Sequence, residues 1–204
     1  MNPTVNALHE HGWWLASRAS GLLALVLVTI SVGIGLAMAG KVMRRPGLSR
    51  WLLAIHEQTA LAGLVAIAVH GITLLGDSWL HPGVTGITVP FAMAYRPIWT
   101  GLGIVAGYMA MLLGLSFYVR KWVGARFWRK AHRATIVVYL LGVVHALGAG
   151  TDASSEWLRW WLLATGVPIA ALFAYRLGAG ARADRRKRRA PRPTASPEPI
   201  TNVR

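Results

Sequence analysis

The chain has 204 residues, of which 54% are hydrophobic and 14% are charged. Because an ordinary soluble domain has roughly 25% charged residues, this composition argues against a soluble globular fold. The chain has no cysteine, which excludes disulfides, iron–sulfur clusters, zinc–thiolate sites and covalently attached haem. The net charge is +15, but the basic residues lie between long apolar runs, a pattern typical of membrane proteins and not of nucleic-acid-binding proteins.

Several stretches are long and apolar enough to cross a bilayer core of about 30 Å, which takes about 20 residues of helix. In chain order they are Trp13–Gly40, Trp51–Gly76, Pro97–Val119, Trp128–Gly150 and Trp157–Leu177. The ten tryptophans lie near the ends of these stretches, where their rings favour the headgroup layer. The sequence therefore predicts an all-α fold, an integral membrane bundle of five transmembrane helices with short connections.

The distribution of Lys and Arg predicts the orientation of this bundle. Of the 22 basic residues, 19 lie in the first loop, in the region 120–133 where the third span ends and the fourth begins, or after Tyr175. Because positive charge is retained in the cytoplasm, we expect the N-terminus outside and the C-terminus inside. Residues 1–12 then form an external segment without the features of a signal peptide, residues 13–177 the membrane domain, and residues 178–204 a basic, disordered cytoplasmic tail near anionic lipid.

Four histidines lie within the predicted spans, where ionisable side chains are costly and indicate function. His56 and His70 lie in the second span, and His132 and His145 in the fourth. Because both spans run in the same direction, His56 matches His132 in depth and His70 matches His145. The two levels are about 20–21 Å apart along a helix. Each pair suits the two axial ligands of one non-covalent b-type haem, whereas two imidazoles are too few for a closed zinc or copper site.

The rotation between the two histidines of each helix differs. At about 100° per residue, 14 steps return to within about 40° of the starting direction, whereas 13 steps leave about 140°. The fourth span must therefore be locally distorted, with Gly142 as one source of freedom, or its histidines must approach from different sides. The glycines at 101, 103 and 107 lie inside a span, so we interpret them as helix-packing residues and not as a dinucleotide loop. We expect no flavin or nicotinamide site in this chain.

Other polar residues complete the candidate site. Arg18 and Arg133 lie near the two predicted levels, and each is placed to pair with haem propionates at its own face, the alternative being contact with lipid headgroups. His9 and His11 precede the first span and are predicted to be solvated, with adventitious metal binding as the alternative. We expect His81 to be a loop residue.

With these residues the chain resembles the ferric reductase-like transmembrane domain, the haem-bearing core of ferric reductases and NADPH oxidases. The resemblance rests on His-x13-His, His-x12-His, the stretch ARFWRKAHRATIVVYLLGVVHALGAGTD and the motif ASRASG of the first span. It implies that His56 and His132 hold the inner haem, that His70 and His145 hold the outer one, and that the chain conducts electrons across a membrane. Family members often add a sixth helix and a flavin and nicotinamide domain, so short bacterial members that exchange electrons with separate partners are the nearer analogue.

These observations lead to one main expectation and three alternatives. The chain is expected to be a di-haem cytochrome b of a bacterial plasma membrane that moves electrons from a cytoplasmic flavoprotein to an outer acceptor. The loop 77–96 is the expected contact for that acceptor, and the inner cations suit an acidic donor. The alternatives are a quinol-linked electron-transfer subunit, a haem-free ion or metal transporter that uses the histidines as a relay, and a membrane scaffold without redox function.

Overall fold

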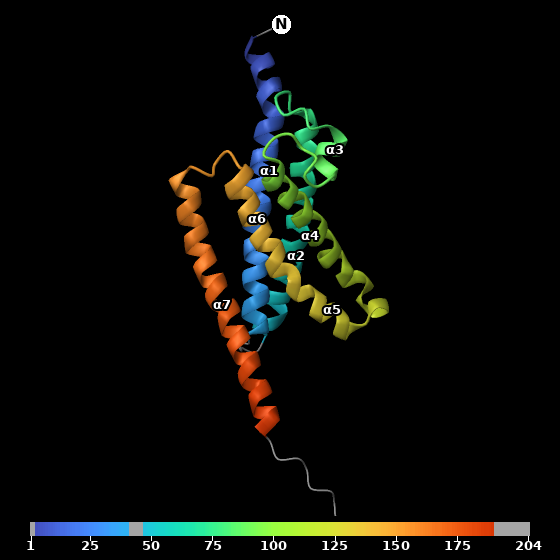
Figure 1. Cartoon of the computed structure of the whole chain (residues 1–204), viewed down its shortest axis with the longest axis vertical. Coiled ribbons are helices and arrows are strands. Elements are labelled where there is room, and N and C mark those ends of the chain that lie inside the picture. The colour runs from blue at the N-terminus through green and yellow to red at the C-terminus, as the bar shows by residue number, and fades with distance from the viewer. Residues whose placement is uncertain (1–2, 41–46, 190–204) are drawn as a thin grey trace, which may run out of the picture.

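The computed structural model describes residues 3–40 and 47–189, and in this part of the chain all regular structure is helical (Figure 1). The long helices are α1 (Pro3–Ala39), α2 (Leu48–Thr73), α4 (Pro97–Val123), α6 (Thr135–Ala149) and α7 (Glu156–Arg189). The short ones are η1 (Leu74–Gly76), α3 (Gly83–Thr88), α5 (Ala125–Ala131) and η2 (His132–Ala134). The all-α prediction is therefore confirmed.

Within the described residues, five helical segments are long and apolar enough to cross a membrane. They are His11–Ala39, Leu48–Gly76, Pro97–Val123, Ala125–Ala149 and Glu156–Arg182. Each overlaps one predicted span, so the sequence identifies the number and the order of these segments. The structure shifts most of their ends outward by a few residues, because helical structure continues past the point where the apolar run stops.

The two chain ends differ from the sequence prediction. Helix α1 already begins at Pro3, within the segment 1–12, and proline is favoured in the first turn of a helix. Helix α7 continues to Arg189, so residues 178–189 of the tail that we expected to be disordered are helical. Alanine and arginine are good helix formers, and basic side chains are favourable at a helix C-terminus. Residues 190–204 and the predicted basic loop residues Lys41, Arg44 and Arg45 lie outside the described residues.

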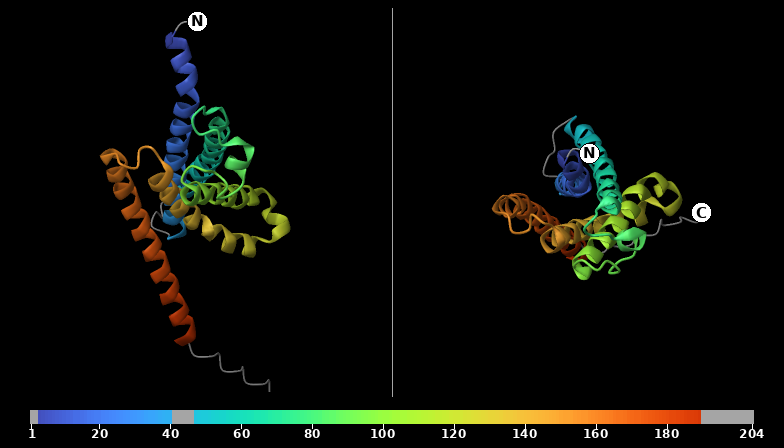
Figure 2. Two further views of the ribbon diagram at one scale, coloured as in Figure 1. Left: turned by 45° about the horizontal axis from the view of Figure 1, so that its top comes forward. Right: turned by 90° about the horizontal axis from the view of Figure 1, so that it is seen from above.

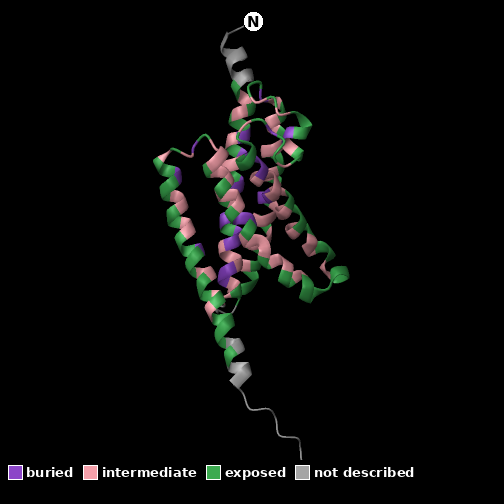
Figure 3. Cartoon of the chain, viewed as in Figure 1, coloured by how far each residue is buried: buried purple, intermediate pink, exposed green. Residues whose placement is uncertain are grey.

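Helix α1 forms the centre of the bundle. Its membrane-length segment is more buried than the other four, and the buried residues in Figure 3 follow its length. Helix α2 packs along α1, helix α4 packs along α6, and α7 packs against α1. A cluster of Val32, Leu36, Tyr139 and Ile169 joins α1, α6 and α7. Helix α7 and the α4–α5 hairpin lie on opposite sides of the bundle (Figures 1 and 2).

The fourth span is interrupted, which is one of the two arrangements that its histidine spacing allows. A turn at Gly124, whose φ of +91° favours glycine, is followed by α5, the three-residue 3₁₀ segment η2 and then α6. Residues of a 3₁₀ helix advance by about 120° instead of about 100°, so η2 reduces the angular offset between the two histidines from about 140° to about 80°. The distortion lies at His132–Ala134 and not at Gly142, where the sequence analysis located the freedom.

Candidate metal centres

The structure brings the four membrane histidines together in two pairs. The ring centroids of His56 and His132 are 6.1 Å apart, with an interplanar angle of 89°. The ring centroids of His70 and His145 are also 6.1 Å apart, with an angle of 73°. The first partner of each pair comes from α2, and the second comes from η2 or α6. These are the two depth-matched pairs expected from the sequence.

The separation of the rings suits a single metal ion between them. A nitrogen of imidazole binds a metal ion such as zinc at about 2.0–2.1 Å. Two rings on opposite sides of one such ion therefore have their centroids about 6 Å apart. Among the described residues, no group of three or more His, Asp, Glu or Cys side chains is placed to hold a metal. Two protein nitrogens per ion therefore suit a metal whose other ligands come from a macrocycle, as in haem.

His70 is held by the first helix. Its Nδ1–H donates to the main-chain carbonyl of Ser17 at 2.8 Å, and the Ser17 hydroxyl lies 3.1 Å from the same nitrogen. The hydroxyl also donates to the carbonyl of His70 at 3.2 Å. One turn further along α1, a methyl group at Gly21 would lie 2.9 Å from Nδ1 of His70. The absence of a side chain at Gly21 therefore lets the imidazole reach the carbonyl.

His56 is held in the same way by Ser31, which lies about four turns after Ser17 in α1. Its Nδ1–H donates to the carbonyl of Ser31 at 2.9 Å, the Ser31 hydroxyl lies 3.1 Å from Nδ1, and the hydroxyl donates to the carbonyl of His56 at 3.3 Å. A methyl group at Gly35 would lie 3.2 Å from Cε1 of His56. The contacts that Ser17 and Gly21 make with His70 are thus repeated by Ser31 and Gly35 with His56.

His145 uses the same principle on another helix. Its Nδ1–H donates to the carbonyl of Trp99 in α4 at 2.9 Å, and a methyl group at Gly103 would overlap its ring. In all three cases the acceptor is the carbonyl of one residue and the glycine follows four positions later. We call this arrangement a carbonyl–glycine cradle. It works because the residue four positions on otherwise covers the carbonyl on that face of the helix.

The three cradles determine which ring nitrogen is free to bind a metal. A carbonyl only accepts hydrogen bonds, so Nδ1 of His56, His70 and His145 carries the proton. In the neutral imidazole, Nε2 then keeps its lone pair. A hydrogen bond from the second ring nitrogen to a carbonyl is also the usual support of metal-binding histidines, because it orients the ring and raises its basicity.

His132 is the exception. Its Nδ1 is buried and has no hydrogen-bond partner among the described residues, although the carbonyl of Leu113 approaches it. The residue four positions after Leu113 is Phe117 and not glycine. The ring of His132 instead stacks on Trp128 with a centroid distance of 4.8 Å and an angle of 23°. Trp128 also has a buried nitrogen without a partner in this part of the chain.

The three cradles are not among the features predicted from the sequence. A signal for two of them is present, because the spacing from Ser17 to Ser31 and from Gly21 to Gly35 equals the 14-residue spacing from His56 to His70. Because α1 and α2 are antiparallel and rise equally per residue, the same spacing in both helices lets Ser17 meet His70 and Ser31 meet His56. Gly103 was interpreted as a helix-packing residue, and the structure shows that it makes room for His145.

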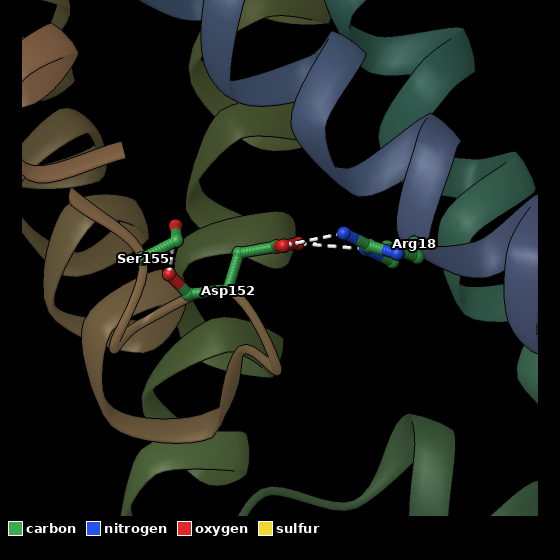
Figure 4. A network of polar contacts seen from close by, with 3 residues as sticks. All are labelled: Arg18, Asp152 and Ser155. Atoms are coloured by element: carbon green, nitrogen blue, oxygen red, sulfur yellow. Dashed lines mark hydrogen bonds and ion pairs between the residues drawn. The ribbon is translucent and has the colours of Figure 1, made fainter. Parts of the chain in front are cut away.

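Arg18 has a protein partner that the sequence did not indicate. Its Nε donates to Asp152 at 2.8 Å and its Nη2 at 2.5 Å, which joins α1 to the loop before α7 (Figure 4). The Asp152 side chain is 11% exposed and that of Arg18 37%. Arg18 also lies over the ring of Trp14. A propionate contact of Arg18 stays a prediction, and it would use Nη1, which does not bond to Asp152.

The remaining predicted residues lie at the periphery. Arg133 follows His132 in η2, and its side chain is exposed. His11 and His81 are also exposed, and His81 lies outside regular helix with a positive φ of 40°. The predicted propionate contact of Arg133 is not tested by this arrangement. The side chain of His9 lies outside the described residues.

Family models and solved structures add no match to this picture. No family model matches the sequence, and no solved structure matches the chain. The geometry of the four histidines and of the residues that hold them is therefore the basis for assigning a function.

Proposed function

We propose that this chain is a transmembrane di-haem cytochrome b of a bacterial plasma membrane, which moves electrons from a cytoplasmic flavoprotein to an outer acceptor. The observation that carries the proposal is the pair of histidine couples, each with ring centroids 6.1 Å apart, in helices long enough to cross a membrane. The resemblance of the two histidine spacings to the ferric reductase-like transmembrane domain points to the same function.

The residues of the chain supply binding and orientation. When bound, each b-type haem exchanges one electron between its ferric and ferrous states. His56 and His132 would hold one haem, and His70 and His145 the other. The carbonyls of Ser17, Ser31 and Trp99 keep the protons of three imidazoles on Nδ1, so that Nε2 of each would be free to bind a haem iron.

Two levels of histidine fit the thickness of a bilayer. The 14 residues from His56 to His70 correspond to about 21 Å of helix, within a hydrocarbon core of about 30 Å. With the orientation predicted from the basic residues, the His56/His132 pair lies on the cytoplasmic side and the His70/His145 pair on the outer side. Each pair then lies nearer to one of the two aqueous phases.

The charge distribution supports an acidic electron donor. The α4–α5 hairpin carries cations at its tip, and with the predicted orientation this tip faces the cytoplasm. These cations are Arg120, Lys121, Arg126, Arg129 and Lys130. Opposite charge steers a partner and fixes its orientation more than it raises affinity. At the other end, the predicted acceptor contact 77–96 folds into α3 and flanking turns, with Trp79 74% exposed.

Spectroscopy of the purified chain tests the proposal. We expect a b-type Soret spectrum, about two haems per chain, and low-spin signals of bis-imidazole iron. A chain without Soret absorbance that still transports ions or metals would contradict the proposal and favour the transporter. Reduction by a quinol analogue in the absence of any flavoprotein would favour the quinol-linked alternative.

A further inference from the structure

The four candidate ligands are not held equally. His56, His70 and His145 each donate a hydrogen bond of 2.8–2.9 Å from Nδ1 to a helix carbonyl. His132 makes no such bond among the described residues, and Phe117 stands four positions after Leu113, where each cradle has a glycine. If an imidazole rotates away from a metal, a cradled ring must break its hydrogen bond inside the bundle. His132 has no comparable bond to break.

The backbone around His132 is also different. The other three histidines lie within α-helices, whereas His132 is the first residue of the 3₁₀ segment η2. Short 3₁₀ segments inside helices have weaker hydrogen-bond geometry and are frequent at functional hinges. Helix α5, which precedes η2, belongs to the hairpin that leans away from the bundle (Figures 1 and 2). The support of His132 is therefore local, and it comes mainly from stacking on Trp128.

Two buried polar atoms without partners lie in this stacked pair. They are Nδ1 of His132 and Nε1 of Trp128, and the two rings are nearly parallel at 4.8 Å. Buried donors without partners are uncommon in native proteins, and at a site they often reflect a functional compromise. Nδ1 of His132 thus lies near the carbonyl of Leu113 without a hydrogen bond to it, so polar contacts fix this ring less firmly than the three cradled rings.

We propose that His132 is the dissociable ligand of the His56/His132 pair, and that the position it vacates binds a small neutral diatomic ligand when the metal is reduced. Trp128 is the positioning residue that limits this dissociation. The inference rests on the proposed function, because it requires a haem at this pair. It adds a ligand-binding site to a protein otherwise expected only to transfer electrons.

Carbon monoxide binding to the full-length, dithionite-reduced protein in detergent tests the inference. We expect a difference spectrum for about one of the two haems per chain. Trp128→Leu removes the stacked ring, and it should raise the rate of carbon monoxide binding by about two- to tenfold, the range expected for one aromatic contact. Trp122→Leu is the matched control on the same hairpin, because Trp122 is 90% exposed, and it should leave the rate unchanged.

The possible outcomes separate this inference from the proposed function. Two haems per chain without any carbon monoxide binding would overturn the inference alone, as would equal rates in the wild type and Trp128→Leu. A chain without haem would overturn the proposed function and the inference with it. If Trp128→Leu does not fold, Trp128→Phe keeps an aromatic ring and should raise the rate by a smaller factor, and an unchanged rate would again contradict the inference.

Discussion

The two histidine pairs have the same ring separation but different support. In the His70/His145 pair, both imidazoles donate to helix carbonyls, one in α1 and one in α4. In the His56/His132 pair, only His56 does so, and His132 stacks on Trp128. Ring separation therefore depends on where the helices place their backbones, whereas ring orientation depends on what a neighbouring helix offers to the second nitrogen.

Among glycine-to-alanine changes, the largest effect on haem content is expected at Gly103. Gly103→Ala places a methyl group within the ring of His145, so we expect loss of the haem at the His70/His145 pair and a haem content near one per chain. Gly35→Ala should have a smaller effect on the other pair, because its methyl group would lie 3.2 Å from His56. Haem content of the purified variants measures both.

Gly142→Ala is the matched control, because Gly142 is also within a span and a methyl group there meets no atom within 4 Å. It should retain the wild-type haem content. Equal haem loss in Gly142→Ala and Gly103→Ala would show that the glycines matter for helix packing in general and not for the histidines.

A smaller effect, on the free energy of unfolding, is expected from loss of the Arg18–Asp152 ion pair beside the His70/His145 pair. Arg18 follows Ser17 in the chain, so its bond to Asp152 fixes α1 close to the cradle of His70. Arg18→Ala leaves the largely buried Asp152 carboxylate without its partner, which should lower the free energy of unfolding by about 1–3 kcal/mol. Thermal unfolding in detergent measures this change. Arg50→Ala, at an exposed site, is the control, and an equal loss in both variants would contradict a specific contribution of the pair.

The smallest effect is expected at the serine hydroxyls. Ser17→Ala keeps the carbonyl that accepts from His70 and removes the hydroxyl 3.1 Å from the same nitrogen. Weaker support of Nδ1–H lowers the basicity of the ligand, so the midpoint potential of one haem should rise by less than about 60 mV, a tenfold change in equilibrium. Ser31→Ala should raise the other potential. Redox titration checks this, and a change in both potentials in either variant would contradict separate cradles.

The features that follow from counting along the chain could be predicted from the sequence. Apolar length gives the five spans, and the spacings of His56 with His70 and of His132 with His145 give the two pairs. The second spacing also allows a break in the fourth span, as one of two alternatives. The place of that break could not be predicted, because η2 packs against α4 and α5, and counting along the chain does not reveal such contacts. The pairing of the histidines was therefore predictable from the sequence, whereas the contacts that support them were not.

The supporting contacts were less accessible for a physical reason. Cradle acceptors are main-chain carbonyls, which every residue has, so only the glycine four positions later carries a signal. The ion pair of Arg18 joins residues 134 positions apart, and nothing in either neighbourhood indicates the other. The helix extends to Arg189 because the helix propensity of alanine and arginine prevails there, although charge and the prolines that follow favour disorder.

Haem stoichiometry of His56→Ala and His145→Ala tests the central claim most directly. The proposal predicts that each variant loses one haem and keeps the other, and that the two variants retain haems with different spectra and potentials. Retention of both haems in both variants would contradict the assignment of the two histidine pairs as separate haem sites.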